Sequence, residues 1–280
     1  MTTMTTTPDA PAYAPTAPAA RVTFGHLVRA EWIKFWSVRS TIWTLSLMAV
    51  AMIALVSLIS MVLRSQGEGG NETGLMPFLI AVNFASLALV VLGILTITGE
   101  YSTGMIRASV AAEPRRTPVL WSKLAVLGGI TLVISALTVA VAALIQTAIL
   151  GSSLALDLGS PEVLRPLAGN ALYLTGIALF AFAWGALLRH SAAAMATVFG
   201  LLLVVETAVN AIPWHPLTYI RPFLPSSAGS RITMTDETIA SVNSMSEGIQ
   251  LNAWQGYGVL VAWIVVLLAL AAVLLKRRDA

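Results

Sequence analysis

The chain has 280 residues, of which 57% are hydrophobic and only 10% are charged, and it contains no cysteine. Soluble domains carry about 25% charged residues, so this composition indicates an integral membrane protein. The lack of cysteine excludes disulfides, thiolate metal sites and thiol nucleophiles. The net charge of +3 does not indicate nucleic-acid binding, because the cations gather beside apolar runs, where lipid and membrane topology explain them.

An amphipathic helix at residues 21–40 is the first ordered segment that we expect. Residues 1–20 are rich in Thr, Pro and Ala and lack the apolar core of a signal peptide, so they are expected to form a disordered tail. At about 100° per residue, most apolar side chains of the helix share one face, as in helices that lie at the membrane interface. Glu31 lies in the middle of this face. Either it pairs with Lys34, or the face docks partly on the protein's own cytoplasmic loops.

Six apolar segments follow, and each meets the requirement of about 20 residues for a membrane-spanning helix. Their predicted limits are 41–63, 77–98, 124–150, 167–188, 192–212 and 257–275. Only Arg189, His190 and Ser191 join the fourth and fifth segments, which predicts a tight helical hairpin. Small residues such as Gly185 and Gly200 favour close packing between these two helices.

The distribution of cations predicts the topology. With the N-terminus inside, twelve of the sixteen lysines and arginines lie on the inner side, so both termini are predicted to be cytoplasmic. The largest outer loop is residues 213–255. Its first part, 213–225, combines four prolines with aromatic residues, which predicts a short re-entrant or interfacial element instead of one continuous helix. The polar remainder is expected to form an exposed outer cap.

A basic loop, residues 99–123, separates the second and third spans. It reads GEYSTGMIRASVAAEPRRTPVLWSK. Residues 102–110 contain no helix breaker except Gly104, and Pro114 then turns the chain. This pattern predicts a short helix across the cytoplasmic mouth of the bundle, suited to receiving force from a soluble partner. The alternative is a solvated loop whose charges only fix the topology.

No catalytic or metal-binding motif is recognisable. The sequence has no GxxxxGK[ST], no HExxH and no GxSxG, and its three histidines are widely scattered. We therefore expect no catalytic residue, no metal site and no ATP hydrolysis by this chain. Glu206 is the only ionisable residue well inside a predicted span. It is either a functional group that faces the bundle interior, or an acceptor for hydrogen bonds from the re-entrant segment, such as from Trp214 or Tyr219.

Residues 100–123 resemble the cytoplasmic loop of the permease subunits of bacterial ABC-2 type transporters. In that family the loop runs roughly E-Y-x-x-G-x-I-R, then a small-residue stretch, then P-R-R and a lysine that opens the third span. The matching positions are Glu100, Tyr101, Gly104, Ile106, Arg107, Pro114, Arg115, Arg116 and Lys123. The N-terminal helix is also similar, with Glu31, Lys34 and Arg39 in the family's E-x-x-K…R pattern.

The resemblance implies an all-α fold in which six spans form a permease subunit of an ATP-driven exporter in the bacterial plasma membrane. Two permease subunits would work with two P-loop ATP-binding subunits, which hold the ATP and Mg²⁺. The loop would contain a coupling helix seated on the ATPase, and residues 21–40 would form the connecting helix. Glu100 and Arg107 would hold the coupling element to neighbouring cytoplasmic helices. Arg115 and Arg116 would meet the ATPase or lipid head groups.

Two other classes of function are weighed against this one. A secondary transporter or channel driven by an ion gradient usually has several ionisable sites near the membrane midplane and repeated halves. Here one acid lies near the outer surface, and the two three-span halves show no obvious similarity. An intramembrane enzyme would need a nucleophile, a metal set or paired acids within the spans. Dependence on an ion gradient instead of ATP would favour the secondary transporter.

Overall fold

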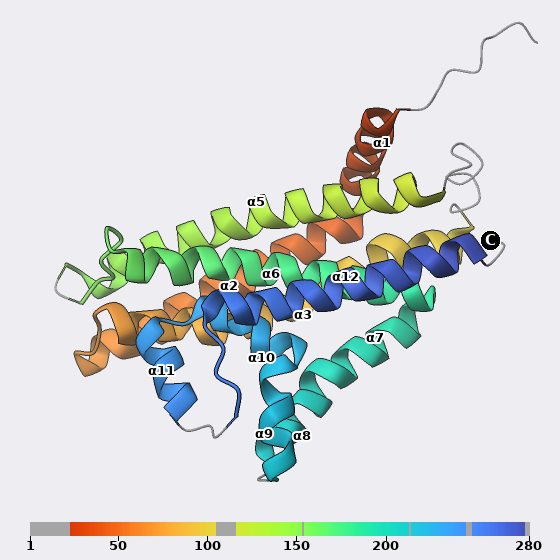
Figure 1. Cartoon of the computed structure of the whole chain (residues 1–280). Helices are drawn as coiled ribbons and strands as arrows, with labels where there is room; N and C mark the ends of the chain where they lie inside the picture. The colour runs from red at the N-terminus through yellow and green to blue at the C-terminus, as the bar shows by residue number, and fades with distance from the viewer. Residues whose placement is uncertain (1–22, 105–115, 153, 213, 245–247, 278–280) are drawn as a thin grey trace, which may run out of the picture.

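The computed structural model describes residues 23–104, 116–152, 154–212, 214–244 and 248–277, and all regular structure in these ranges is helical. The longest helices run along one axis as a bundle (Figure 1). The α-helices are α1 (Phe24–Ser37), α2 (Arg39–Gln66), α3 (Asn71–Thr103), α5 (Arg116–Leu150), α6 (Pro161–Leu188), α7 (Ser191–Phe199), α8 (Glu206–Ala211), α9 (His215–Ile220), α10 (Pro225–Gly229), α11 (Asp236–Ser244) and α12 (Ala253–Arg277). A π-helical segment, η1 (Gly200–Val205), joins α7 to α8, and η2 (Arg221–Phe223) and η3 (Ser230–Thr233) are short 3₁₀ turns.

The six predicted spans are confirmed as helices. Within the described residues, six helical stretches are long and apolar enough to cross a membrane: Arg39–Gln66, Thr73–Thr103, Thr117–Leu150, Pro161–Leu188, Ser191–Ala211 and Ala253–Leu275. Most begin several residues before the predicted limit. The helices therefore include polar residues at their ends. The predicted limits left these residues out because they were set by the apolar run alone.

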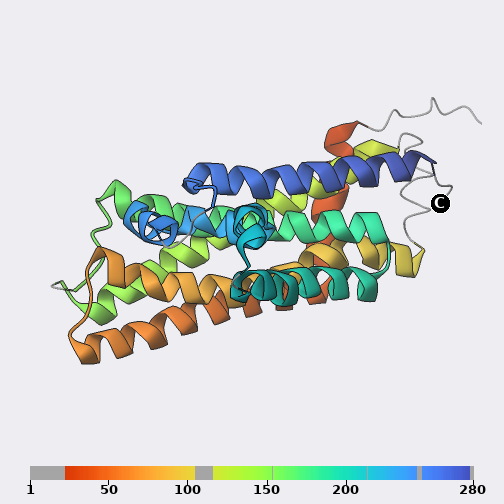
Figure 2. The same ribbon diagram turned by 60° about the horizontal axis from the view of Figure 1, so that its bottom comes forward.

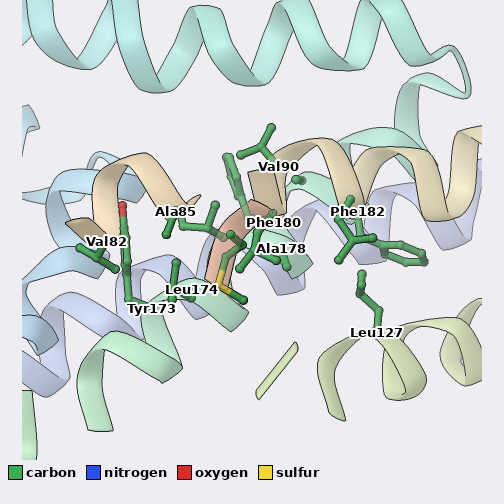
Figure 3. Close-up of a cluster of buried hydrophobic side chains, with 14 of the residues drawn as sticks. Val82, Ala85, Val90, Leu127, Tyr173, Leu174, Ala178, Phe180 and Phe182 are labelled. Atoms are coloured by element: carbon green, nitrogen blue, oxygen red, sulfur yellow. The ribbon is translucent and has the colours of Figure 1, made fainter. Parts of the chain in front are cut away.

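Helix α6 is the central element of the bundle. It contacts α3, α5 and α12 and is buried along most of its length. Glycines allow α3 and α6 to approach closely: a Cβ on Gly93 would lie only 2.2 Å from the carbonyl oxygen of Ala178. Figure 3 shows side chains of the buried core, and the residues that it labels belong to α3, α5 and α6. The labelled residues are Val82, Ala85, Val90, Leu127, Tyr173, Leu174, Ala178, Phe180 and Phe182.

The fifth span leaves the bundle. Arg189, in a left-handed conformation with φ 57°, ends α6, and α7 begins at Ser191 after the predicted short link. From there α7, η1 and α8 diverge from the other spans (Figure 1). The predicted close packing through Gly185 and Gly200 is wrong. Gly185 faces Ile94 and Ile97 of α3, whereas a Cβ on Gly200 would meet no atom within 4 Å.

The segment after α8 returns to the bundle as a series of short helices. Prolines break it into α9, η2 and α10, as the sequence predicted. The expectation of a wholly exposed cap after residue 225 is wrong for α10 and η3, which pack on α6 and α12, whereas α11 is largely exposed. The reason is backbone proximity, because Cβ atoms on Gly169 and Gly256 would lie 2.0 and 2.4 Å from carbonyl oxygens of this segment.

The predicted N-terminal helix is present as α1, which is shorter than residues 21–40. It ends at Ser37, and Val38 adopts an extended conformation before α2 begins. Helix α1 crosses the axis of the bundle at one end, in both views (Figures 1 and 2). Trp32, Ile33 and Trp36 are exposed on it and Phe35 is buried. The predicted tail, residues 1–20, lies outside the described residues.

Candidate functional site

Four charged side chains meet where α1 crosses the end of the bundle. Glu31 and Lys34 come from α1, one helical turn apart. Glu100 lies in the last turn of α3, and Lys123 lies in the second turn of α5. We call these four residues the charge cluster. Three helices that are distant in the sequence are therefore joined at one point.

The carboxylate of Glu100 is the centre of the charge cluster. Its Oε1 accepts a hydrogen bond from the ammonium group of Lys123 and also forms an ion pair with that of Lys34. Lys123 also donates to Oε2 of Glu31, at 2.7 Å. Glu31 thus bonds to a residue of the predicted 99–123 loop, which supports the second of the two alternatives considered for it. The amphipathic face of α1 docks partly on the protein itself: Phe35 and Glu31 contact the bundle, whereas Trp32 and Trp36 stay exposed.

Burial of the charge cluster restricts how α1, α3 and α5 can be arranged. The side chain of Lys123 is 1% exposed and that of Glu100 is 5% exposed, so both charges have lost most of their hydration. Two carboxylates and two ammonium groups compensate one another, but only in an arrangement in which each charge reaches its partner. Removing one partner would leave a buried charge uncompensated. The relative positions of α1, α3 and α5 are therefore fixed at this end of the bundle.

Lys34 is the more exposed of the two cations of the charge cluster, and its pKa is lower than that of an ordinary lysine. Burial lowers its pKa from an ordinary 10.5 to about 8. The nearby charge of Lys123 acts in the same direction, and together they outweigh the opposite effect of Glu31. Lys34 is therefore mostly charged near neutral pH, and it loses its charge as the pH rises through about 8.

Helix α3 ends immediately after the charge cluster. Gly104 adopts a left-handed conformation with φ 74°, and its N–H donates to the carbonyl of Tyr101. The expected helical run over residues 102–110 is therefore interrupted at Gly104, because a glycine without Cβ readily takes this helix-ending conformation. The ring of Tyr101 lies 5.4 Å from the guanidinium carbon of Arg189, a cation–π contact. This contact joins the end of α3 to the link between α6 and α7.

Glu206 lies elsewhere, at the start of α8, and is 3% exposed. Its Oε1 accepts the backbone N–H of Ser226 at 2.8 Å, and its Oε2 accepts both the N–H and the hydroxyl of Ser227, at 2.8 and 2.7 Å. The structural alternative for this acid is thus supported, with different donors from Trp214 and Tyr219. The reason is that the first N–H groups of α10 have no partner within their own helix and point toward the carboxylate.

Comparison with protein families gives a match to the ABC-2 family transporter proteins over residues 68–280. The chain belongs to the ABC-2 transporter family. It is therefore a multi-pass membrane protein and the membrane permease component of an ABC transporter, a class that works with an ATP-binding subunit. Comparison with curated proteins gives no match. The family match includes Glu100 and Lys123 but begins after α1.

The structure of this ABC-2 permease places the predicted coupling residues only in part. Glu100 and Tyr101 are in the last turn of α3, and Gly104 caps that helix. Arg107 and Arg115 lie outside the described residues, as does most of the predicted coupling helix. Arg116 is the first residue of α5, and the position of its side chain is not described. The predicted connecting-helix residues Glu31 and Lys34 belong to the charge cluster.

Two residues of the permease have roles that the sequence alone did not assign. Lys123 matched the family motif but was otherwise treated as a loop cation that fixes topology. Its position indicated that it belongs to the helix of the third span, because no glycine or proline separates Lys123 from the apolar residues that follow. Arg189 was treated as part of a short link. Its contact with Tyr101 joins segments 88 residues apart, and no local pattern indicates it.

Proposed function

We propose that this ABC-2 permease is the membrane-spanning subunit of an ATP-driven exporter and that residues 99–123 couple it to a separate P-loop ATPase. The charge cluster is the observation that carries the proposal. Glu100 precedes residues 105–115 and Lys123 follows them, and the two side chains are bonded to each other and to α1. A displacement of residues 105–115 would move α1, α3 and α5 together, because separating their buried ion pairs costs considerable free energy.

The exporter contains two permease subunits and two ATP-binding subunits. ATP and Mg²⁺ are bound by the ATPase, since this chain carries no P-loop motif. Arg107 helps to hold the coupling element, and Arg115 and Arg116 meet the ATPase or lipid head groups. ATP-driven closure of the ATPases moves the coupling segment and α1, and this switches the cavity between the permease subunits from inward- to outward-facing.

The subunit lies in the bacterial plasma membrane with both termini in the cytoplasm. The described part of the chain supports this orientation, because its cations are divided between the two ends of the bundle. Arg29, Lys34, Arg39, Lys123 and Arg189 belong to helix ends on the side that α1 crosses, whereas Arg64 of α2 and Arg165 of α6 belong to helix ends at the opposite end of the bundle. An excess of cations marks the cytoplasmic side.

Affinity purification of the tagged chain from its native membrane tests the proposal. A P-loop ATPase is expected to co-purify at near-stoichiometric amount. Arg107→Glu reverses a charge in the proposed coupling segment and is expected to abolish co-purification or ATPase coupling. Arg64→Ala is the matched control, because Arg64 is a cation at the opposite end of the bundle, where it donates to the carbonyl of Ile149.

Two results would overturn the proposal. In the first, the chain purifies alone and transports in liposomes without ATP, driven by an ion gradient. This result would establish the secondary transporter. In the second, Arg107→Glu retains both the ATPase and its coupling to transport, which would remove residues 99–123 from the coupling path.

A further inference from the structure

A cavity of about 290 Å³ lies within the segment that joins the fifth and sixth spans. Residues of α8, α9, η2, α10, η3 and α11 line it. Two arginines, Arg221 and Arg231, belong to its wall, and no acidic residue does within the described part of the chain. Small-molecule sites begin at about 300 Å³, so the cavity suits a compact ligand.

The two arginines of this cavity have no acidic partner. Neither forms an ion pair with a carboxylate of a described residue. Asp236, which follows Arg231 closely in the sequence, pairs with Arg165 instead. Glu206 does not line the cavity, and both of its oxygens already accept hydrogen bonds from the start of α10. Burial lowers the pKa of Arg231 without an opposing acid, yet an arginine stays protonated in proteins. The wall therefore carries two uncompensated positive charges.

Both arginines also have hydrogen-bond donors to spare. Arg231 is buried, and its Nη1 donates to Asn243 and to the carbonyl of Leu251, at 2.8 and 2.7 Å. Arg221 uses Nε and Nη2 to bind two carbonyls near the end of α8, at 3.0 and 2.6 Å. Nη1 of Arg221 and both Nε and Nη2 of Arg231 have no partner among the described residues. None of these three nitrogens is sealed from solvent, so a molecule in the cavity can reach them.

The charges and donors of the wall favour an anion with several oxygens. A carboxylate offers two oxygens and a single negative charge. A phosphate monoester offers three terminal oxygens and a charge of about −1.5 to −2 at pH 7, which can compensate two arginines. The planar guanidinium group also matches phosphate oxygens with two parallel hydrogen bonds. Charge and donor number therefore favour phosphate over carboxylate.

We propose that this cavity binds a phosphate monoester, with the phosphate between Arg221 of η2 and Arg231 of η3. The free guanidinium N–H groups donate to the phosphate oxygens. The part of the ligand next to the phosphate lies against Pro222, Met234 and Val242, which line the rest of the cavity. A lipid head group or a soluble ester can supply this chemistry. The inference does not rest on the proposed ATPase coupling, because no residue of the cavity belongs to α1, α3 or α5.

Binding of labelled glycerol 3-phosphate to the full chain tests the site. The chain is delipidated and reconstituted into nanodiscs of phosphatidylcholine. Glycerate is the matched ligand, because it has a carboxylate in place of the phosphate. We expect glycerol 3-phosphate to bind at least fivefold more tightly than glycerate. Equal affinities, or no binding of glycerol 3-phosphate, would overturn the proposal.

A lipid competitor identifies the source of the phosphate. Phosphatidic acid carries a phosphate monoester on acyl chains, whereas phosphatidylglycerol is an anionic lipid without one. Nanodiscs that contain phosphatidic acid should bind glycerol 3-phosphate at least fivefold less than nanodiscs with the same fraction of phosphatidylglycerol if the natural ligand is a lipid. Equal binding in the two kinds of nanodisc assigns the site to a soluble ester.

Arg221→Gln removes one of the two charges and should weaken the binding of glycerol 3-phosphate at least tenfold. Arg64→Gln is the matched control. Arg64 also donates to a backbone carbonyl, at 2.7 Å, and has no ion pair with a described acid, but it does not line the cavity. Its substitution should leave the affinity unchanged. An unchanged affinity in folded Arg221→Gln would contradict the site.

A second pair of variants does not alter either arginine. Val242 lines the cavity from α11 and is 38% exposed, so a polar residue there should be tolerated by the fold. Val242→Glu adds a carboxylate that competes with the ligand for the arginines, and it should weaken binding at least fivefold. Val242→Gln has the same size without the charge and should bind as wild type does. Equal affinities of the two variants would overturn the proposal.

Discussion

Lys123 of α5 and Glu31 of α1 are 92 residues apart in the sequence, yet the ammonium of one lies 2.7 Å from the carboxylate of the other. The same ammonium also bonds to Glu100 of α3. A single buried lysine of α5 thereby fixes α1 against α3 and α5. The contact lies beside residues 99–123, through which an ATPase would act. Its strength therefore affects both the stability of the fold and the proposed coupling.

Lys123→Met should destabilise the permease strongly. The substitution keeps the length and apolar stem of the side chain but leaves Glu31 without its cation and Glu100 with only Lys34. Removing one partner of a buried ion pair costs about 3–5 kcal/mol, so a large drop in the thermal unfolding midpoint is expected. Lys34→Met is the control. Its side chain is 26% exposed, so its loss should cost much less. Equal midpoints for the two variants would contradict the assigned geometry.

Lys34 should react with an amine-directed reagent at lower pH than an ordinary lysine. Its pKa of about 8 leaves about half of its amine neutral at pH 8, whereas an unperturbed lysine is well under 1% neutral there. Trace acetylation followed by mass spectrometry should give a midpoint near pH 8 for Lys34. An added lysine-containing peptide is the internal reference. A midpoint near that of the reference peptide would show that burial does not shift this group.

The same pKa predicts how stability depends on pH. Since the folded pKa of Lys34 lies below its unfolded value of 10.5, the unfolded chain binds more protons between about pH 8 and pH 10.5. The contribution of Lys34 to the free energy of unfolding therefore rises with pH in this window, and it is lowest below pH 8. The difference in thermal midpoint between wild type and Lys34→Met, measured at pH 7 and pH 9.5, checks the sign. A thermal midpoint of wild type that falls relative to that of Lys34→Met at pH 9.5 would contradict the predicted sign.

Glu206→Gln should loosen the attachment of α10 to α8. Glutamine keeps one acceptor oxygen, but its amide nitrogen would face an N–H of Ser226 or Ser227 that the carboxylate now accepts. An unsatisfied buried donor costs about 1–3 kcal/mol. Hydrogen exchange at residues 226 and 227 should become faster. Ser227→Ala removes only the hydroxyl donor and should have a smaller effect. Unchanged exchange together with reduced transport would instead favour a role for Glu206 in the substrate path.

Gly93→Ala should destabilise the bundle, whereas Gly129→Ala should not. The new methyl group at position 93 would lie 2.2 Å from the backbone oxygen of Ala178, so α3 and α6 would have to separate. Overpacking of this kind costs about 1–3 kcal/mol. At position 129 the methyl group meets no atom within 4 Å, and alanine favours the helix by about 1 kcal/mol over glycine. Thermal midpoints that move in the same direction would contradict the close approach of α3 and α6.

Local signals in the sequence were sufficient for much of the fold. Apolar length alone identified the six spans, because a bilayer requires about 20 apolar residues whatever surrounds them. Prolines predicted the broken segment after α8, since the missing N–H acts within one helical turn. The motif around Glu100 and Arg107 indicated the family that the comparison over residues 68–280 then showed.

Only the tertiary structure decided which residues meet. Gly185 could have faced either neighbouring span, and its contact with α3 depends on the direction in which α7 leaves the bundle. Glu31 could have paired with Lys34, but a buried cation from α5 satisfies it. Such contacts join positions tens of residues apart, and their energies depend on burial, which arises only when the helices assemble. The sequence by itself therefore determined the helices and their class, and packing determined the charge cluster and the partners of Glu206.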